Sequence, residues 1–236
     1  LGSYPSVGEA MSSHLAPGAI VTDVGSVKGC VARDLGPHIP HGVHLVPGHP
    51  VSGSEKSGPE AGFETLFDDR WWILTPDADA DQDVVRTLAA FVKALGSQVE
   101  IMDAGRHDLV LAITSHLPHL IAYNIVNTAD DMESVTQGEV VKFSAGGFRD
   151  FTRIAASDPE FWRDVFLNNR DAVLETLGRF TEDLIALQRA SRWGQGDNLL
   201  RLFSNSRDIR QRIIQAGQDT DAPDFGRRTD HGLDAE

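Results

Sequence analysis

The stretch "AIVTDVGSVKGCVARDLG", residues 19–36, decides the fold of this chain. A short apolar run ends in Asp23 and a turn that contains glycine, and residues with helical spacing follow. Strand, tight turn and helix in this order are typical of a nucleotide-binding βα unit. No glycine-rich phosphate loop occurs in the 236 residues, so we expect that loop to precede Leu1.

Similar segments alternate over the first hundred residues. The alternation predicts a parallel sheet with crossover helices. The region 47–69 interrupts it with glycines and prolines, and we expect a long ordered loop of the kind that often carries function. The strand candidates are "AIVTD" (19–23), "GVHLV" (42–46), "WWILT" (71–75) and "QVEIM" (98–102), and the helix candidates are 5–16, 27–36 and 80–95.

After residue 103 the sequence predicts helices only. The stretch 105–127 is apolar on nearly every side, so we expect it to be buried all round. Apolar residues at helical spacing over 173–187 and 199–213 predict amphipathic helices that pack against something. The predicted fold class is α/β plus all-α: the remainder of a Rossmann-type parallel sheet (1–102), then a helical domain (103–216). The polar end, 217–236, is predicted to be disordered.

Composition limits the partners and the compartment. A net charge of −14 argues against a nucleic-acid or membrane surface, because both require a basic face. Cys30 is the only cysteine, which excludes a disulfide framework and indicates a reducing compartment, the cytoplasm. The apolar window 107–128 contains three histidines, Asp108 and Pro118, so it indicates a core helix rather than a membrane span.

The loop "PGHPVSGSEKSGPEAG" (47–62) is the densest cluster of chemical groups. It follows a predicted parallel strand, and ligands of open α/β sheets bind at the carboxyl ends of strands. His49 is therefore a candidate general base, with Glu55 nearby, although a plain surface turn is the alternative. Ser26 is predicted to cap the helix that follows the first strand, where its hydroxyl could also touch a cofactor or substrate.

His116 and His119 lie three residues apart in the apolar stretch "SHLPHL" (115–120). A zinc site needs further ligands at suitable spacing, and none stands out, so we expect no metal. Polar groups inside an apolar helix are costly without partners. The pair therefore indicates a wet pocket, with two core histidines as the alternative.

The segment "GGFRDFTRIAASDPEFWRD" (146–164) places Arg149 and Arg153 four residues apart, on one predicted helix face among apolar residues. A guanidinium in such a place suits a planar carboxylate. The alternative is a solvated face in which the arginines pair with Asp150.

In this order the clusters resemble the prephenate/arogenate (cyclohexadienyl) dehydrogenase family of tyrosine biosynthesis. The resemblance runs from about residue 19 to 216. The matching stretches are "DVGSVKG", "GHPVSGSEKSGPEAG", "LFDDRWWILTP", "ITSHLPHLIAYNI" and "GGFRDFTRIAASDPEFWRDVF".

The resemblance implies a cytoplasmic homodimer that binds NAD or NADP on a Rossmann domain. It also implies a cyclohexadiene substrate between that domain and a helical dimerisation domain. Hydride leaves ring C4 for the nicotinamide while the ring carboxylate departs as carbon dioxide. Without the phosphate loop, the chain from Leu1 is expected to be inactive by itself.

The family pattern also implies roles for single residues. His49 accepts the hydrogen bond or proton of the C4 hydroxyl, Ser26 lies beside that hydroxyl, and Arg153 holds the ring carboxylate. His119 lies near the side-chain end of the substrate. The candidate catalytic residues are His49 and Ser26; the candidate substrate contacts are Arg153, His119, His116, Glu55, Trp162 and Arg149; the candidate cofactor contacts are Asp23, Gly25 and Ser26.

Two other readings stay open. A β-hydroxyacid or 6-phosphogluconate type of dehydrogenase shares the two-domain plan, but it relies on a lysine in the first long helix of the helical domain, and 105–127 contains none. A non-catalytic dimerising remnant is the other alternative. The sequence leaves the choices between prephenate and arogenate, and between NAD and NADP, undecided.

Overall fold

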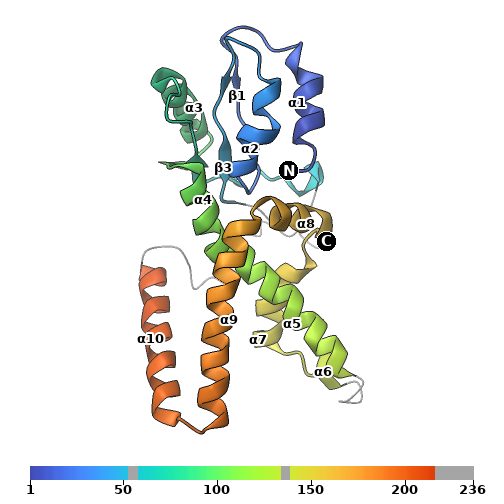
Figure 1. Cartoon of the computed structure of the whole chain (residues 1–236), viewed down its shortest axis with the longest axis vertical. Helices are drawn as coiled ribbons and strands as arrows, with labels where there is room; N and C mark the ends of the chain where they lie inside the picture. Colours follow the sequence, from blue (N-terminus) through green and yellow to red (C-terminus); the bar gives the residue numbers. More distant parts are fainter. Residues whose placement is uncertain (53–57, 134–138, 216–236) are drawn as a thin grey trace, which may run out of the picture. The chain divides into compact units, whose positions relative to one another are not determined.

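The computed structural model describes residues 1–52, 58–133 and 139–215 (Figure 1). Two predictions from the sequence, Glu55 as a substrate contact and a disordered tail over 217–236, lie outside these residues. The chain divides into two compact units, residues 1–178 and residue 179 onward, and each is described by itself.

The first unit begins with the predicted βα unit. Strand β1 (Ile20–Val21) pairs in parallel with β2 (His44–Leu45), and α2 (Gly29–Asp34) connects them. Helix α1 (Tyr4–Ser12) lies beside α2, and a short 3₁₀ turn follows at Gly36–His38 (Figure 1). The parallel pairing of the first two strand candidates is confirmed.

A second, three-stranded sheet corrects the expectation for 47–69. Strand β4 (Trp71–Leu74) pairs in parallel with β5 (Gln98–Ile101), as predicted. Its other edge holds β3 (Gly48–Pro50), which is antiparallel and lies where a loop was predicted. Glycine and proline hide this strand from a propensity reading, and only its pairing with β4 reveals it. A 3₁₀ turn at Pro59–Ala61 also interrupts the predicted loop.

Helix α3 (Gln82–Ala94) connects β4 to β5 and supplies the first core. It buries Val85, Leu88 and Val92, three residues at helical spacing, against Trp72 and Leu74 of β4. Burial of these side chains holds the crossover helix on the sheet.

The rest of the first unit is helical. Trp162 and Val165 of α8 pack against Val27 and Cys30 beside and within α2, which forms a second core between the βα unit and the helices. The helical elements are α4 (Ala104–Leu111), a π-helical turn (Ala112–His116), α5 (Leu117–Glu133), α6 (Glu139–Lys142), α7 (Gly146–Thr152), a 3₁₀ turn (Arg153–Ala156), α8 (Pro159–Asn168) and the start of α9 (Arg170–Arg192).

The prediction that 105–127 is buried on every side is wrong for the single chain. One face packs into the first unit, but Leu109, Ile113 and Ile125 are exposed, Ile113 by 55%. The run Ala104–Met132 has the length and apolar composition of a membrane span. It also carries buried polar side chains that bond to other elements of the same unit, which is the environment of a core helix.

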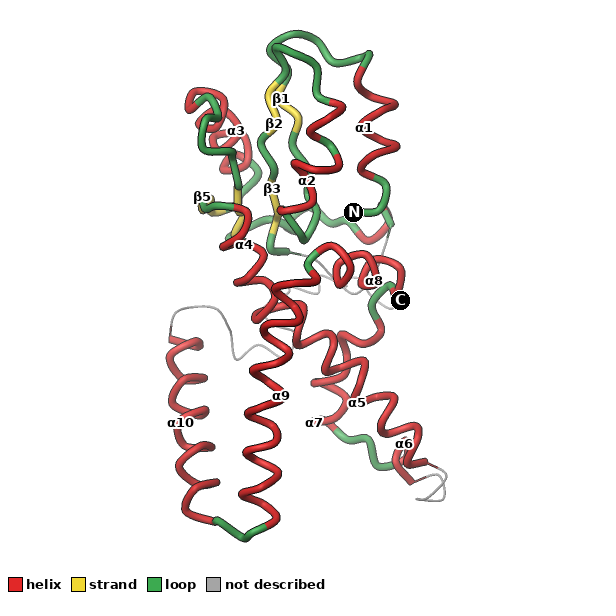
Figure 2. Tube along the Cα trace, in the orientation of Figure 1, coloured by secondary structure: helices red, strands yellow, loops and turns green. Residues whose placement is uncertain are grey.

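The second unit consists of the rest of α9, from residue 179, and of the helix α10 (Gly196–Gln215). A turn at Gly194 joins the two helices (Figure 2). Gly194 has a φ of 60°, a conformation that favours glycine. Both predicted amphipathic helices are present, yet Leu184, Leu200 and Phe203 remain exposed, Phe203 by 58%. Their apolar faces are not covered within the described part of the chain.

Candidate functional site

His49 lies in β3 and is buried, with 7% of its surface exposed. Its Nδ1 is 2.8 Å from Nε2 of His107 in α4. Burial, and then the nearby His107 and Lys28, lower the pKa of His49 well below its ordinary value. His49 is therefore a neutral imidazole at neutral pH, which is the form that can accept a proton.

A buried ion pair holds the backbone that carries His49. Lys28 is fully buried and pairs with Asp23. The Lys28 ammonium donates to the Gly48 carbonyl at 2.6 Å, and the Gly48 N–H donates to Asp23 at 3.1 Å. A Cβ on Gly48 would lie 2.8 Å from the Trp72 Nε1. The residue before His49 is thus fixed on both its polar groups and has no room for a side chain.

The start of α2 differs from the prediction for Ser26. The helix begins at Gly29 with Lys28 as N-cap residue, so Ser26 lies in the preceding turn and the predicted capping role is wrong. The free N–H groups of Lys28 and Gly29 instead donate to the two carboxylate oxygens of Asp108 in α4, each at 2.8 Å. Asp108, about 80 residues away in sequence, thus accepts the hydrogen bonds at the start of α2 that the Ser26 hydroxyl was expected to accept.

Asp23 and Gly25, two candidate cofactor contacts, have structural roles. The Asp23 carboxylate also accepts hydrogen bonds from the Tyr4 hydroxyl and from the Gly25 N–H. A Cβ on Gly25 would overlap the Tyr4 hydroxyl at 2.0 Å. Both residues therefore shape the turn after β1, and their contact with a cofactor stays a prediction.

His116, His119 and Trp162 come together as a cluster. The His119 ring stacks on Trp162 with centroids 3.5 Å apart, and His116 meets the same indole edge-on at 6.0 Å. The His116 Nδ1 is 3.0 Å from the Asn169 amide nitrogen, which donates to it, so Nε2 carries the proton. This Nε2 has no hydrogen-bond partner among the described residues.

Burial sets the charge of these two histidines. It lowers the pKa of His116 to about 4, and it also lowers the pKa of His119, with a smaller contribution from the positive charge of Arg153. Arg153 therefore lies close enough to His119 for its positive charge to lower the pKa of that histidine. The cluster offers neutral hydrogen-bonding groups beside one cation.

The two arginines do not lie in one α-helix as predicted. Helix α7 ends at Thr152, and Arg153 begins a 3₁₀ turn, so the four-residue spacing does not run along one α-helix. Arg149 has 75% of its side chain exposed and donates to Asp150 at 3.0 Å. This is the solvated pair that was the alternative, and a substrate contact by Arg149 stays a prediction.

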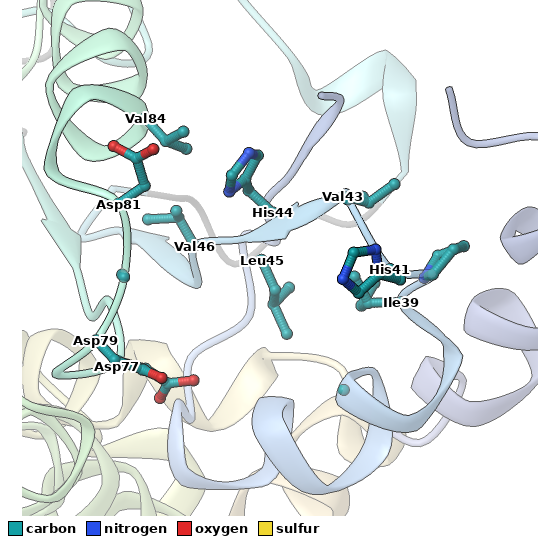
Figure 3. Close-up of a pocket in the computed structure, with 14 residues that line it drawn as sticks. Ile39, His41, Val43, His44, Leu45, Val46, Asp77, Asp79, Asp81 and Val84 are labelled. Atoms are coloured by element: carbon teal, nitrogen blue, oxygen red, sulfur yellow. The ribbon is translucent and has the colours of Figure 1, made fainter. Parts of the chain in front are cut away.

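A separate pocket of about 530 Å³ lies beside β2 (Figure 3). His41 and His44 line it from the β2 side, and Asp77 and Asp81 line it from the segment that leads into α3. None of the candidate site residues lines this pocket, so the histidine cluster is a different place in the unit.

Four further residues organise the site and were not predicted from the sequence: Lys28, His107, Asp108 and Asn169. All are buried and polar. The signal was available for His107 and Asp108, because a buried polar group requires a partner, and the two stand side by side in an apolar helix. Their partners lie in other elements, which sequence spacing does not reveal.

A strand–turn–helix unit that packs on helices carrying histidines and an arginine fits one class of protein, the two-domain nicotinamide-dependent dehydrogenases. Two family profiles match the chain: "Prephenate dehydrogenase, nucleotide-binding domain" over residues 4–101 and "Prephenate dehydrogenase, dimerization domain" over residues 103–205. The chain therefore belongs to the prephenate dehydrogenase family, whose members are NAD(P)-dependent oxidoreductases of tyrosine biosynthesis.

Individual relatives support the assignment to this family. The chain is 41% identical to the cyclohexadienyl dehydrogenase of Zymomonas mobilis, over 86% of this chain and 69% of that protein. It is 35% identical to the prephenate dehydrogenase of Bacillus subtilis, over 81% of this chain and 51% of that protein. Its fold matches the crystal structure of prephenate dehydrogenase from A. aeolicus in complex with hydroxyphenyl propionate and NAD⁺, with a TM-score of 0.83 and 33% identity, over 90% of this chain and 73% of that one. The chain thus spans about half to three quarters of these relatives.

Proposed function

We propose that the protein oxidatively decarboxylates prephenate, arogenate or both, and transfers hydride to NAD or NADP. The observation that carries this proposal is His49, a buried histidine within strand β3 that burial keeps neutral. A neutral imidazole accepts a hydrogen bond from a substrate hydroxyl without a metal.

The reaction balances with a base of this kind. The C4–H bond breaks and its electron pair leaves as hydride, while the bond from the ring to its carboxylate breaks and carbon dioxide departs. The electrons of that bond complete the aromatic ring. The base holds the proton of the C4 hydroxyl while the oxygen becomes carbonyl-like, and the proton returns to the phenol oxygen, so no net proton is released.

The other candidate residues supply binding. Arg153 holds the ring carboxylate, since a guanidinium fork matches a planar anion. His119 and Trp162 form an aromatic wall, supported by their 3.5 Å stack. His116 has a buried Nε2 without a hydrogen-bond partner among the described residues, and we assign a polar group of the substrate as its partner.

The residues after β1 fit the nicotinamide end of the cofactor. In residues 24–26 the Val24 side chain is 62% exposed, next to Gly25 and the half-buried Ser26. An apolar and small-residue surface at the carboxyl end of a parallel strand suits a flat ring. When bound, NAD or NADP supplies the hydride acceptor, and Ser26 contacts it and the C4 hydroxyl.

The protein acts as a homodimer in the cytoplasm. Support for the dimer comes from the exposed apolar residues of α4–α5 and of α9–α10, and from the match to a dimerization-domain family. Isolated exposed residues are common on monomers, but contiguous apolar helix faces mark interfaces. Support for the compartment comes from the single, unpaired Cys30.

The test is a spectrophotometric assay of the full gene product with each substrate and each cofactor. We expect reduction of NAD or NADP that depends on prephenate or arogenate and that is lost in His49→Asn. Turnover of a β-hydroxy acid with no response to either cyclohexadiene would contradict the proposal. The absence of lysine from Ala104–Met132 already argues against that chemistry.

A further inference from the structure

Three buried side chains form a continuous hydrogen-bonded row that ends at His49. The His49 Nδ1 lies 2.8 Å from the His107 Nε2, and the His107 Nδ1 lies 2.8 Å from an Asp108 carboxylate oxygen. His107 is fully buried, and the other two are nearly so. The row joins α4 of the helical part to β3 of the nucleotide-binding part.

The acidic end of the row is held in place by other elements. The two Asp108 oxygens accept the N–H groups of Lys28 and Gly29, and the Asp108 carbonyl accepts from the Asn169 amide at 2.8 Å. Each carboxylate oxygen of Asp108 thus has one backbone N–H donor. Asp108 therefore acts as a fixed acceptor for His107.

Hydrogen-bond accounting then sets each ring proton. A carboxylate only accepts, so the His107 Nδ1 carries the proton between these two groups. The His107 Nε2 of a neutral ring is left as an acceptor, and the His49 Nδ1 must donate to it. A neutral His49 that is protonated at Nδ1 has its lone pair at Nε2.

We infer that His107 and Asp108 are positioning residues that select the tautomer of His49 in which Nε2 is the acceptor. The inference rests on the proposed role of His49 as acceptor for the substrate hydroxyl. The row does for His49 what the aspartate of a serine-protease triad does for its histidine: it fixes ring orientation and tautomer.

The reversed arrangement requires an extra proton on the row. His107 would then be a cation that donates through Nε2 to His49, which would place the His49 proton on Nε2 and remove the acceptor. That cation would sit in a fully buried position, while Asp108 already has two N–H donors. Burying a positively charged imidazolium here is costly, which favours neutral rings for both His107 and His49 beside the Asp108 carboxylate.

The direct test is ¹⁵N NMR of histidine-labelled protein at neutral pH, with the His49 signals assigned by their loss in His49→Asn. We expect a protonated, pyrrole-type Nδ1 and an unprotonated, pyridine-type Nε2 for His49. In His107→Leu this pattern should be lost, because Nδ1 no longer has its acceptor. A pyridine-type Nδ1 for His49 in the wild type would overturn the inference.

Kinetics of the full gene product give a second readout. His107→Leu should lower kcat by roughly 10- to 100-fold, the value of one strong hydrogen bond, and should change the KM for the cyclohexadiene little. His107→Gln should recover most of the loss, because its terminal oxygen can replace Nε2 as the acceptor. His14→Gln, at an exposed histidine outside the site, is the matched control and should behave as wild type.

The outcomes separate the two proposals. If the wild type turns over neither prephenate nor arogenate, the proposed function fails, while the NMR result still decides the tautomer. Equal kcat values for wild type and His107→Leu would overturn the positioning role. His107→Leu is first checked for folding by circular dichroism. If it does not fold, the tautomer of wild-type His49 and the kcat of His107→Gln test the inference instead. A His107→Gln variant as slow as His49→Asn counts against the inference.

Discussion

Gly29→Ala is expected to change stability in a direction that depends on Asp108. A Cβ at Gly29 would lie 2.9 Å from the Asp108 carboxylate oxygen that accepts the Gly29 N–H at 2.8 Å. The carboxylate cannot move away without losing that charged hydrogen bond, which is worth about 1.5–3 kcal/mol. Alanine in place of glycine returns about 0.4–1 kcal/mol through the unfolded chain. The net expectation is a loss of about 1–2 kcal/mol in the free energy of unfolding.

The sign should reverse when Asp108 is replaced by alanine. The opposing oxygen is then gone, and Gly29→Ala should stabilise by about 0.4–1 kcal/mol. Urea unfolding of the four proteins of the double-mutant cycle, at one protein concentration, measures the coupling, which we expect at about 1.5–3 kcal/mol.

A matched control is available in α9. Gly178 has no atom within 4 Å of an added Cβ, so Gly178→Ala should stabilise by about 0.5–1 kcal/mol in both backgrounds. If Gly29→Ala stabilises the wild-type protein as Gly178→Ala does, the reasoning about the Asp108 carboxylate is refuted.

Four further outcomes are expected. His49→Asn should lower kcat by about 10²–10⁴-fold. Because burial lowers the pKa of His49, the apparent pKa of the acid limb of wild-type kcat/KM should lie below the ordinary histidine value of about 6.5. An apparent pKa above about 6.5 would contradict the buried, neutral base. Arg153→Lys should raise the KM for the cyclohexadiene by about 30- to 150-fold, the equivalent of about 2–3 kcal/mol, and an unchanged KM would show that the guanidinium does not hold the carboxylate. Burial lowers the pKa of His116 to about 4 in the folded protein, so on acidification the unfolded chain binds the proton first. The free energy of unfolding should therefore fall as the pH drops from about 6.5 to 4, by about 3 kcal/mol at pH 4. In urea unfolding, His116→Asn should lack this part of the pH dependence. Light scattering at micromolar concentration should give a dimer mass that Phe203→Glu, at an exposed apolar position of α10, reduces toward the monomer, and a monomer mass for the wild type would argue against the interface.

The sequence alone determined four of the five strands of the first unit and the helix α3 between β4 and β5. Apolar runs and helical spacing are local signals, so they located β1, β2, β4, β5 and α3 to within a few residues. An unpartnered polar group inside an apolar helix is unfavourable, and on this ground His116 and His119 were predicted to line a pocket. In the structure both rings contact Trp162.

Only the tertiary structure decided how these groups are connected. The antiparallel strand β3 exists because β4 pairs with it, and its Gly-His-Pro sequence carries no strand signal of its own. The cap of α2 comes from Asp108 rather than from the neighbouring Ser26, and the row that holds His49 joins residues 58 positions apart. Hydrogen bonds between distant segments leave no periodicity in the sequence, because periodicity records only which face of one element is buried. The candidate residues were therefore readable from the chain, whereas their burial and their hydrogen-bond partners depend on segments that folding brings together.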